Sequence, residues 1–433
     1  MTKSVVSLAD KYTQQAGRVF MSTVQALVRL PLEQSRRDSA AGISSAGFIS
    51  GYRGSPLGTY DAALWGAQHL LDEHRVTFLP GLNEELAATS VRGSQQLAWF
   101  GTSQVQGVFG LWYGKGLGCD RAMEALKLGN LEGSAAQGGV LVLTGDDHGG
   151  KSSASAHQSE HALIAAFIPV LYPATPAEVL EFGLLGWSMS RYSGLYVGFK
   201  CVTDTLDFSA SVTLPDPFAP HQFPALPAAL PGGLNLRQLQ PPLAQEALTV
   251  NHRLPAAQAF ARANGIDRVV LDSPRRELSI LSAGKAYLDL RQALDDLGLG
   301  AQRCAALGIR VLKLGLVWPL DAEGLRTFAC GSREVLVVEE KRPVIEEQAA
   351  RILYAEPTHE RPALTGKADM AGAQLISSTG ELNAAMLRQA IYRRLAALGL
   401  VDAELEARAA AWAAIDARAA ATAALRSSPV RRR

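Results

Sequence analysis

The chain has 433 residues, of which 48% are hydrophobic and 19% are charged, and its formal net charge is +1. This balance excludes a disordered chain and gives no sign of binding to nucleic acid or to a membrane surface. The four cysteines are scattered without a CxxC pair, so zinc ribbons, iron–sulfur ligation and disulfide scaffolds have no support, and we expect no metal ligands. No signal-like or membrane-spanning apolar run occurs, so we expect a cytoplasmic protein of two or three domains.

Apolar runs alternate with helical patterns over residues 1–212. The runs are "GFISGY", "VQGVFGLWY", "GGVLVLTGDD", "IPVLYP" and "LYVGFKCV", and helical patterns such as "TYDAALWGAQHLLDEH" and "CDRAMEALKLGNL" lie between them. An unbroken apolar run is typical of a strand that is buried on both faces of its sheet. The sequence therefore predicts an α/β fold with a doubly wound, mostly parallel sheet in this region.

The middle of the chain is rich in proline, with eight prolines from Pro215 to Pro242. This composition predicts an extended linker over residues 213–265 that packs along a surface. A second, smaller α/β domain is predicted over residues 266–396, with strands in "LSILSAG", "IRVLKLGLVWPL" and "EVLVVEEKRP" and a helix in "KAYLDLRQALDDLGL". Residues 397–433 are rich in alanine and arginine, which predicts a detached helix that buries little, followed by a basic tail.

The segment "SGYRGSPLG", residues 50–58, lies between an apolar strand and a helical pattern. Three glycines and one proline in nine residues predict a sharp loop. Such loops often hold a phosphate or a cofactor ring. The loop by itself does not decide which ligand it takes.

Glu84 and Glu85 follow Asn83, a suitable helix N-cap, in "GLNEELAATSVRG". Two acidic residues in a first helical turn most often complement the helix dipole. The alternative is that one of them points into a cofactor pocket. These residues alone favour the first interpretation.

Two short patterns have simpler explanations than the sites they resemble. The glycines of "YGKGLGCDRAMEAL" are spaced GxGxG, with no acidic residue at the distance that a dinucleotide site requires, which favours a tight turn. The pattern "HQSEH" matches the HxxEH zinc-peptidase motif, with His157 and His161 as ligands and Glu160 as base. No third ligand stands out, so a solvated or substrate-facing loop is the favoured interpretation.

Charged residues follow two of the predicted strands. In "VLVLTGDDHGGKSS", Asp146, Asp147, His148 and Lys151 leave a buried strand at the sheet edge where open α/β folds bind ligands. A functional role and an ordinary loop role are about equally favoured for them. In "VVEEKRPVIEEQ", residues 339–342 are expected to pair with one another at a domain interface.

Taken together, these segments resemble the thiamine diphosphate-dependent 2-oxoacid:acceptor oxidoreductases, above all the long, fused bacterial indolepyruvate ferredoxin oxidoreductases. The match rests on segments in a fixed order, including "AGFISGYRGSPLGTYD", "FLPGLNEELAATSVRGSQQ", "WYGKGLGCDRAMEA", "GGVLVLTGDDHGGKSS", "HQSEHAL" and "EVLVVEEKRPVIEEQ". It implies a pyrimidine-binding domain over residues 1–212 and a domain like the transketolase C-terminal domain over residues 266–396. The implied reaction is oxidative decarboxylation of indolepyruvate or another arylpyruvate to an acyl-CoA.

The resemblance also implies roles for site residues. In that family the pyrimidine-contacting glutamate begins a helix nine residues before a glycine, and Glu84 with Gly93 has this spacing whereas Glu85 does not. Glu84 is therefore the expected catalytic residue, with its carboxyl group hydrogen-bonded to a ring nitrogen of the cofactor. The loop residues implied to line the same half of the cofactor site are Gly54, Ser55 and Pro56.

The substrate side of the site is expected to be basic. Either Arg53 or His148 would pair with the carboxylate of the 2-oxoacid, and Lys151 is a further candidate on the same loop as His148. The sequence does not choose among them.

The chain departs from the family in one respect. Fused members continue into a diphosphate-binding domain that holds magnesium and the cofactor's phosphates, and neither its GDG-type motif nor cluster-binding cysteine runs occur here. We therefore expect a truncated or split version that meets magnesium and iron–sulfur clusters only through a companion chain, in a homo- or hetero-oligomer. Its other partners would be a 2-oxoacid, coenzyme A and ferredoxin, without nucleic acid or membrane. The alternatives are a non-catalytic remnant or scaffold that pairs with intact subunits, and a zinc hydrolase through "HQSEH".

Overall fold

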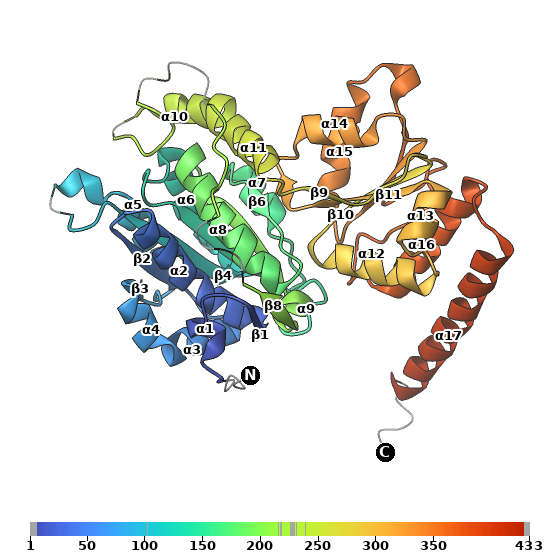
Figure 1. Cartoon of the computed structure of the whole chain (residues 1–433), viewed down its shortest axis with the longest axis horizontal. Helices are drawn as coiled ribbons and strands as arrows, with labels where there is room; N and C mark the ends of the chain where they lie inside the picture. The colour runs from blue at the N-terminus through green and yellow to red at the C-terminus, as the bar shows by residue number, and fades with distance from the viewer. Residues whose placement is uncertain are drawn as a thin grey trace, which may run out of the picture. The chain divides into compact units, whose positions relative to one another are not determined.

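The computed structural model describes residues 7–101, 103–214, 216, 219–225, 230, 232–238 and 240–427. The chain forms two compact units, namely unit 1 (Met1–Asp267 with Leu314–Gly324) and unit 2 (Arg268–Lys313 with Leu325–Arg433). Figure 1 labels their helices and strands. The predicted basic tail, residues 428–433, lies outside the described residues.

The main sheet of unit 1 has seven strands in the order β12-β6-β7-β5-β4-β2-β3. Their bounds are β2 (Ser45–Gly51), β3 (Val76–Phe78), β4 (Gly107–Lys115), β5 (Val140–Asp146), β6 (Val170–Leu171), β7 (Val197–Val202) and β12 (Leu316–Trp318). Neighbouring strands are parallel except at the edge, where β12 runs antiparallel to β6. β5 is buried along its whole length, as its unbroken apolar run predicted.

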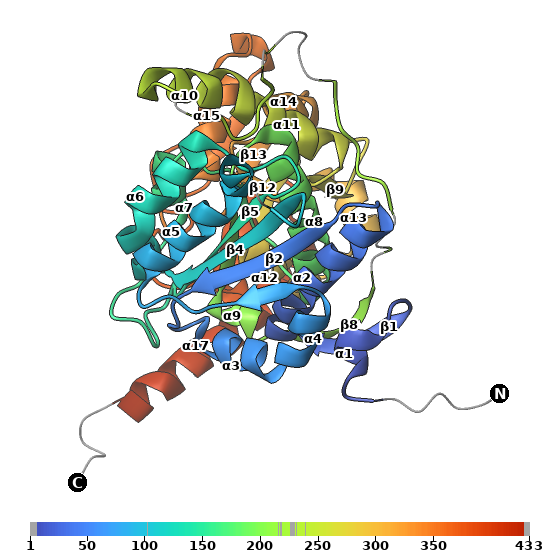
Figure 2. The same ribbon diagram turned by 90° about the vertical axis from the view of Figure 1, so that its left-hand side faces the viewer.

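Helices cover both faces of this sheet. α2 (Thr23–Ala40) and α8 (Pro176–Ser193) pack together on one face, while α5 (Glu84–Gln95) and α6 (Gly116–Glu132) pack together on the other (Figure 2). The remaining elements up to residue 213 are α1 (Asp10–Thr13), β1 (Arg18–Ser22), α3 (Gly58–Gly66), α4 (Gln68–Glu73), η1 (Leu97–Phe100), α7 (Glu160–Ala165), α9 (Thr203–Leu206) and β8 (Ser209–Thr213). The predicted doubly wound, mostly parallel α/β fold is therefore confirmed.

The proline-rich segment is docked on unit 1, and its second half is helical. It forms α10 (Pro242–Leu248), a π-helical turn η2 (Thr249–Arg253) and α11 (Leu254–Ala263), so the prediction of an extended linker is wrong for these residues. The reason is that Pro242 occupies the first turn of α10, where the missing N–H costs nothing, while Pro255 follows the π-helical turn η2, which runs directly into α11. Before them, the Tyr192 hydroxyl donates to the Pro224 carbonyl at 2.9 Å, and the Phe223 ring packs against the rings of Tyr192 and Phe260.

Unit 2 is built on a five-stranded sheet in the order β14-β13-β10-β11-β9. Its strands are β9 (Arg268–Leu271), β10 (Leu278–Ala283), β11 (Ile309–Leu314), β13 (Glu334–Val338) and β14 (Ala363–Thr365). Its helices are α12 (Gly284–Asp296), α13 (Ala301–Leu307), α14 (Ala322–Ala329), α15 (Ile345–Tyr354), η3 (Thr358–Glu360), α16 (Ala384–Ala397) and α17 (Ala403–Ser427). β13 runs parallel to β10 and β14, and β9 runs antiparallel to β11.

The run "IRVLKLGLVWPL", predicted as one strand, is divided between two sheets. β11 belongs to unit 2, whereas β12 joins the main sheet of unit 1. The break falls at Gly315, where a Cβ would lie 2.6 Å from the Ile266 carbonyl oxygen. The N–H groups of Gly315 and Leu316 both donate to the Asp267 carboxylate, which turns the chain out of β11.

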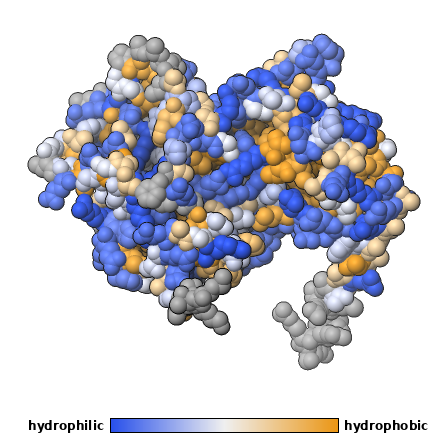
Figure 3. Space-filling model, viewed as in Figure 1, coloured by the Kyte–Doolittle hydropathy of each residue, from blue (hydrophilic) through white to orange (hydrophobic). Residues whose placement is uncertain are grey.

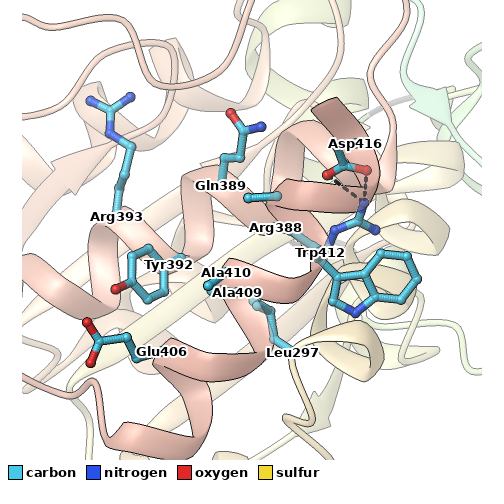
Figure 4. A pocket seen from close by; sticks show the side chains of 11 residues that line it. Leu297, Arg388, Gln389, Tyr392, Arg393, Glu406, Ala409, Ala410, Trp412 and Asp416 are labelled. Carbon is cyan, nitrogen blue, oxygen red and sulfur yellow. Dashed lines mark hydrogen bonds and ion pairs between the residues drawn. The ribbon is translucent and has the colours of Figure 1, made fainter. Parts of the chain in front are cut away.

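α17 is not the detached helix that the sequence predicts. Leu405 is fully buried, the Trp412 indole N–H donates to the Asp296 carbonyl at 3.0 Å, and Asp416 forms an ion pair with Arg388 of α16. Residues of α16 and α17, with Leu297, line an open pocket of about 430 Å³ beside this ion pair. Figure 4 shows the side chains that line it. A few anchoring side chains therefore hold the first half of an alanine-rich helix, although alanine itself buries little.

The surface visible in Figure 3 is mainly hydrophilic, with apolar residues that are scattered in places and gathered in patches in others. Within the described part of the chain, no helix has both the length and the apolar character that crossing a bilayer requires.

Candidate active site

The candidate site lies at the carboxyl edge of the main sheet of unit 1. β2, β4 and β5 are adjacent and parallel, and they end near one another at Gly51, Lys115 and Asp146. β2 runs into the segment of residues 50–58, called the glycine-proline loop below. β4 is followed directly by α6, and β5 is followed by the loop of residues 147–159. Ligands of open α/β sheets bind at this edge.

Glu84 begins α5 beside this edge. The Asn83 side chain caps the helix by accepting from the Leu86 N–H at 2.9 Å, and the Glu84 carbonyl accepts from the Trp112 indole N–H at 2.9 Å. These two contacts fix the first turn of the helix, so that Glu84 is only 3% exposed. Its neighbour Glu85 is exposed to solvent.

The Glu84 carboxyl group has an incomplete set of partners. Its Oε2 atom is buried and has no hydrogen-bond partner, and the Arg121 Nη1 atom lies 3.7 Å away, beyond hydrogen-bond reach. A Cβ at Gly118 of α6 would lie 2.5 Å from the Glu84 Oε1 atom, so the carboxyl group is pressed against the helix. A buried oxygen without a partner is unfavourable, and a ligand with an N–H group would satisfy it.

The glycine-proline loop lies beside the end of β4. A Cβ at Gly54 would lie 2.9 Å from the Lys115 Cδ atom, so a larger residue there would displace the Lys115 side chain. The Ser55 hydroxyl is hydrogen-bonded to the Ser152 hydroxyl, and the Ser55 carbonyl accepts from the Ser153 hydroxyl at 3.2 Å. The loop therefore contacts the loop of residues 147–159.

The three basic candidates differ in their surroundings. Arg53 is exposed on the glycine-proline loop, and His148 is only 3% exposed. The Lys151 side chain is 52% exposed and lies 3.5 Å from the Asp204 carboxylate. All three are on loops that follow strands of the same sheet edge, which is compatible with a binding site for an anion.

Asp147 organises the loop that carries His148 and Lys151. Its carboxylate accepts from the backbone N–H groups of residues 151, 152 and 153 at distances of 2.7–3.1 Å. Although burial alone would raise the pKa of Asp147, these donors hold that pKa below its usual range. Asp147 thus has a structural role, one of the two roles that the sequence left open.

Asp146 is fully buried at the end of β5. It accepts from the Ser159 N–H at 2.9 Å, from the Ser159 hydroxyl at 2.5 Å and from the His157 Nδ1 atom at 3.1 Å. The Lys200 ammonium lies 3.7 Å away and forms a 2.5 Å ion pair with Glu160. Burial alone would raise the pKa of Asp146, but the hydrogen bond with His157 and the charge of Lys200 lower it.

The two short motifs lie where a strand or a loop passes into a helix. In "GKGLG" the chain passes from β4 directly into α6, which begins at Gly116. In "HQSEH" His157 lies in a loop before α7, which begins at Glu160, so the favoured interpretation as a loop holds for His157 and the single helical face of a zinc peptidase is not formed. Within the described residues, no cluster of three or more His, Cys, Asp or Glu side chains could hold a metal ion.

In unit 2, the Glu339 carboxylate accepts from the N–H groups of Val344, Ile345 and Glu346 at 2.9–3.0 Å, and Glu340 pairs with Lys285 at 3.2 Å. Burial raises the pKa of Glu339 to about 7. These contacts attach the two carboxylates to α15 and α12, and the expected pairing among residues 339–342 stays a prediction.

Sequence reasoning missed three residues that shape the site, namely Gly118, Asp120 and Arg121. For Gly118 the sequence held a signal of close packing. Gly116 and Gly118 both lie in the first turn of α6, and glycine is unfavourable in a helix unless a neighbouring group needs the space. The reason is close approach: a Cβ at Gly116 would lie 2.2 Å from the His157 Nδ1 atom.

Comparisons with known proteins agree with this fold. Residues 267–425 match the family model of the indolepyruvate ferredoxin oxidoreductase middle domain. Indolepyruvate oxidoreductase subunit IorA of Methanothermobacter thermautotrophicus is 24% identical over 349 residues, which cover 78% of this chain and 49% of that protein. The same subunit of Archaeoglobus fulgidus is 25% identical over 218 residues, covering 49% of this chain and 32% of that protein. The chain thus spans about half the length, or less, of these curated relatives.

Two solved structures have a similar fold. The 2-oxoglutarate:ferredoxin oxidoreductase of Magnetococcus marinus, described with 2-oxoglutarate, coenzyme A and succinyl-CoA bound, aligns with a TM-score of 0.58 and 15% identity, covering 88% of this chain and 66% of that chain. A split-gene transketolase, described as an inactive β4 tetramer, aligns with a TM-score of 0.51 and 13% identity, covering 87% and 98%. The resemblance that the motifs indicated is therefore confirmed: the chain is similar to the indolepyruvate ferredoxin oxidoreductases, and its residues 267–425 match the middle-domain model of that family.

Proposed function

We propose that unit 1 supplies the pyrimidine half of a thiamine diphosphate site in an oxidoreductase that converts indolepyruvate or another arylpyruvate to an acyl-CoA. The observation that carries this proposal is the buried Glu84 Oε2 atom, which has no hydrogen-bond partner at the ligand-binding edge of the sheet. When bound, thiamine diphosphate supplies the carbanion chemistry that 2-oxoacid decarboxylation needs. Ferredoxin would accept the electrons.

The residues present fit the aminopyrimidine of that cofactor. Glu84 offers a buried carboxyl oxygen to a ring nitrogen, and its backbone is fixed by Asn83 and Trp112. The glycine-proline loop, with Gly54 and Ser55, would line the ring and keep water from it. Glu84 would then hold or share one proton at its Oε2 atom, a role that suits a carboxyl group in a water-poor pocket.

A companion chain would supply the diphosphate half of the site, with its magnesium ion and the route to iron–sulfur clusters. The experiment is isothermal titration of the full chain with thiamine diphosphate and magnesium, with and without a companion chain that carries the diphosphate-binding domain. We expect weak heat for the chain alone and tight, saturable binding in the mixture. Absence of binding in both arms would contradict the proposal and favour a non-catalytic scaffold.

Arg53 is proposed to bind the substrate carboxylate, with His148 and Lys151 as the alternatives. Because a charge-assisted hydrogen bond contributes about 1.5–3 kcal/mol, Arg53→Ala should raise KM for the 2-oxoacid by roughly tenfold to a hundredfold. The affinity for thiamine diphosphate should stay unchanged. Steady-state kinetics of Arg53→Ala, with the exposed Lys127→Ala on α6 as control, would check this. An unchanged KM would transfer the role to His148 or Lys151.

A further inference from the structure

His157 bridges two carboxylates that belong to different elements. Its Nδ1 atom is 3.1 Å from the Asp146 Oδ1 atom at the end of β5, and its Nε2 atom is 2.8 Å from the Asp120 Oδ2 atom on α6. The imidazole is 12% exposed, Asp146 is fully buried, and the Asp120 side chain is half exposed. The motif that suggested zinc in the sequence thus forms a carboxylate–imidazole–carboxylate bridge.

Only one protonation state of the ring satisfies both contacts. A neutral imidazole has one N–H donor and one acceptor nitrogen, so one nitrogen would face a carboxylate oxygen without a proton between them. The imidazolium has two donors and completes both hydrogen bonds with charge assistance. With both carboxylates ionised, the geometry therefore favours a protonated His157.

The bridge connects the two halves of the candidate site. On one side it holds α6, whose Gly118 packs against the Glu84 carboxyl group. On the other side, His157 closes the loop of residues 147–159, because its backbone N–H donates to the Asp147 carbonyl at 3.4 Å. That loop carries His148 and Lys151 and is hydrogen-bonded to Ser55 through two serines.

The charges around His157 favour the imidazolium. The titratable groups on the elements packed around it are Asp146, Asp120, Cys119, Lys200, Glu160 and His148. Burial alone would lower the pKa of His157, but its hydrogen bonds to Asp146 and Asp120 raise that pKa above the ordinary value of 6.5. Because the folded-state pKa is raised, the stability from this bridge is full below pH 6.5 and is lost as the pH rises through the raised pKa.

We propose that His157, as an imidazolium, is a positioning residue that fastens the loop of residues 147–159 to α6 and so keeps the basic residues of that loop at the edge where Glu84 lies. This inference rests on the proposed function in one respect, namely that the loop of residues 147–159 lies on the side of the site where the substrate binds. The bridge itself is a property of the chain without cofactor. Loss of the proton from His157 releases the loop.

Amide hydrogen exchange of the full chain, without cofactor, tests the bridge. After correction for intrinsic exchange, the peptide spanning residues 147–159 should exchange about tenfold faster at about pH 9 than at about pH 6. A peptide from α8 in the same sample should not change. Equal corrected protection of the loop at both pH values would overturn the proposal.

Asp120→Asn is the variant that separates this role from a merely structural one. A neutral His157 can donate from Nδ1 to Asp146 and accept at Nε2 from the new amide, so the loop should stay protected at about pH 9. His157→Phe should leave the loop unprotected at both pH values. Loss of protection at high pH in Asp120→Asn, as in the unaltered chain, would contradict the bridge.

A second measurement covers the case in which the variants fail to fold. In the unaltered chain, NMR titration of the histidine side chains should show one imidazole whose pKa lies above 6.5 and coincides with the midpoint of loop release. If no histidine titrates with the loop, the proposal fails. A negative cofactor titration with a positive exchange result would instead reject the proposed function and leave the bridge standing.

Discussion

Replacing Arg253 with methionine should lower the free energy of unfolding by about 3–5 kcal/mol, because several backbone carbonyl groups lose their donor and a buried unsatisfied polar group costs about 1–3 kcal/mol. The Arg253 side chain is fully buried and donates to the carbonyls of residues 130–132, which end α6, and to those of Leu234 and Asn235, at 2.7–3.3 Å. Methionine fills a similar volume but provides no donors. Five carbonyl groups would lose a partner, and the loss costs most at those of Leu234 and Asn130, whose hydrogen bonds are buried.

Arg262, on the neighbouring helix α11, is the matched control. Its side chain is 44% exposed and pairs with the buried Asp321 and the exposed Glu323, so Arg262→Met should cost less than Arg253→Met, about 1–2 kcal/mol. Urea unfolding of both variants, followed by circular dichroism and tryptophan fluorescence, would measure the difference. Equal destabilisation of the two variants would mean that the carbonyl cluster contributes little.

The same arginine shows why the docking of the proline-rich segment could not be predicted. Composition predicts an extended linker, and nothing in "VNHRLPAAQAF" indicates that one side chain reaches five carbonyl groups far away in the sequence. Gly133 and Gly194 make room for the guanidinium, since a Cβ at either would lie 2.4–3.1 Å from it. Such long-range caps override local propensity, and only the folded chain reveals them.

Fold class, by contrast, follows from local pattern. The runs that became β4 and β5 are long, apolar and without alternation, which only a strand covered on both faces tolerates. The strand predicted over residues 309–320 was harder to assign, because its apolar pattern continues across Gly315 although the chain passes there from one sheet to another. Periodicity indicates that a segment is extended, but it does not indicate which sheet the segment joins.

The candidate site was predictable in part. Strand ends locate its loops, but the choice of Glu84 over Glu85 needed the family spacing, because both residues suit a first helical turn. The structure supplies a physical distinction: Glu84 lies against Gly118, whereas Glu85 is exposed. The "HQSEH" motif matches a metal site in residue spacing only, because the backbone begins its helix three residues later than that site requires, which agrees with the loop that the sequence favoured.

Glu84→Gln should reduce turnover by roughly a hundredfold to ten-thousandfold at saturating cofactor, the range typical of a lost general acid–base group. Glutamine keeps the shape of the side chain and its contact with Gly118 but cannot carry the proton that the carboxyl group holds or shares. Removing a buried carboxylate that has an unpartnered oxygen relieves a desolvation cost. The variant should therefore be as stable as the unaltered chain or more so, which separates a catalytic role from a structural one.

Glu85→Gln is the control for this change, since it removes the same charge one residue along the helix from an exposed position. It weakens the same interaction with the helix dipole, which contributes only a few tenths of a kcal/mol to about 1 kcal/mol. Turnover of the 2-oxoacid by the chain with its companion, together with the melting temperature of each variant, would distinguish the two positions. Loss of activity in Glu84→Gln alone, at undiminished stability, would mark the carboxyl group as catalytic. Near-normal turnover in Glu84→Gln would remove Glu84 from the reaction and leave its burial against α6 as a packing feature.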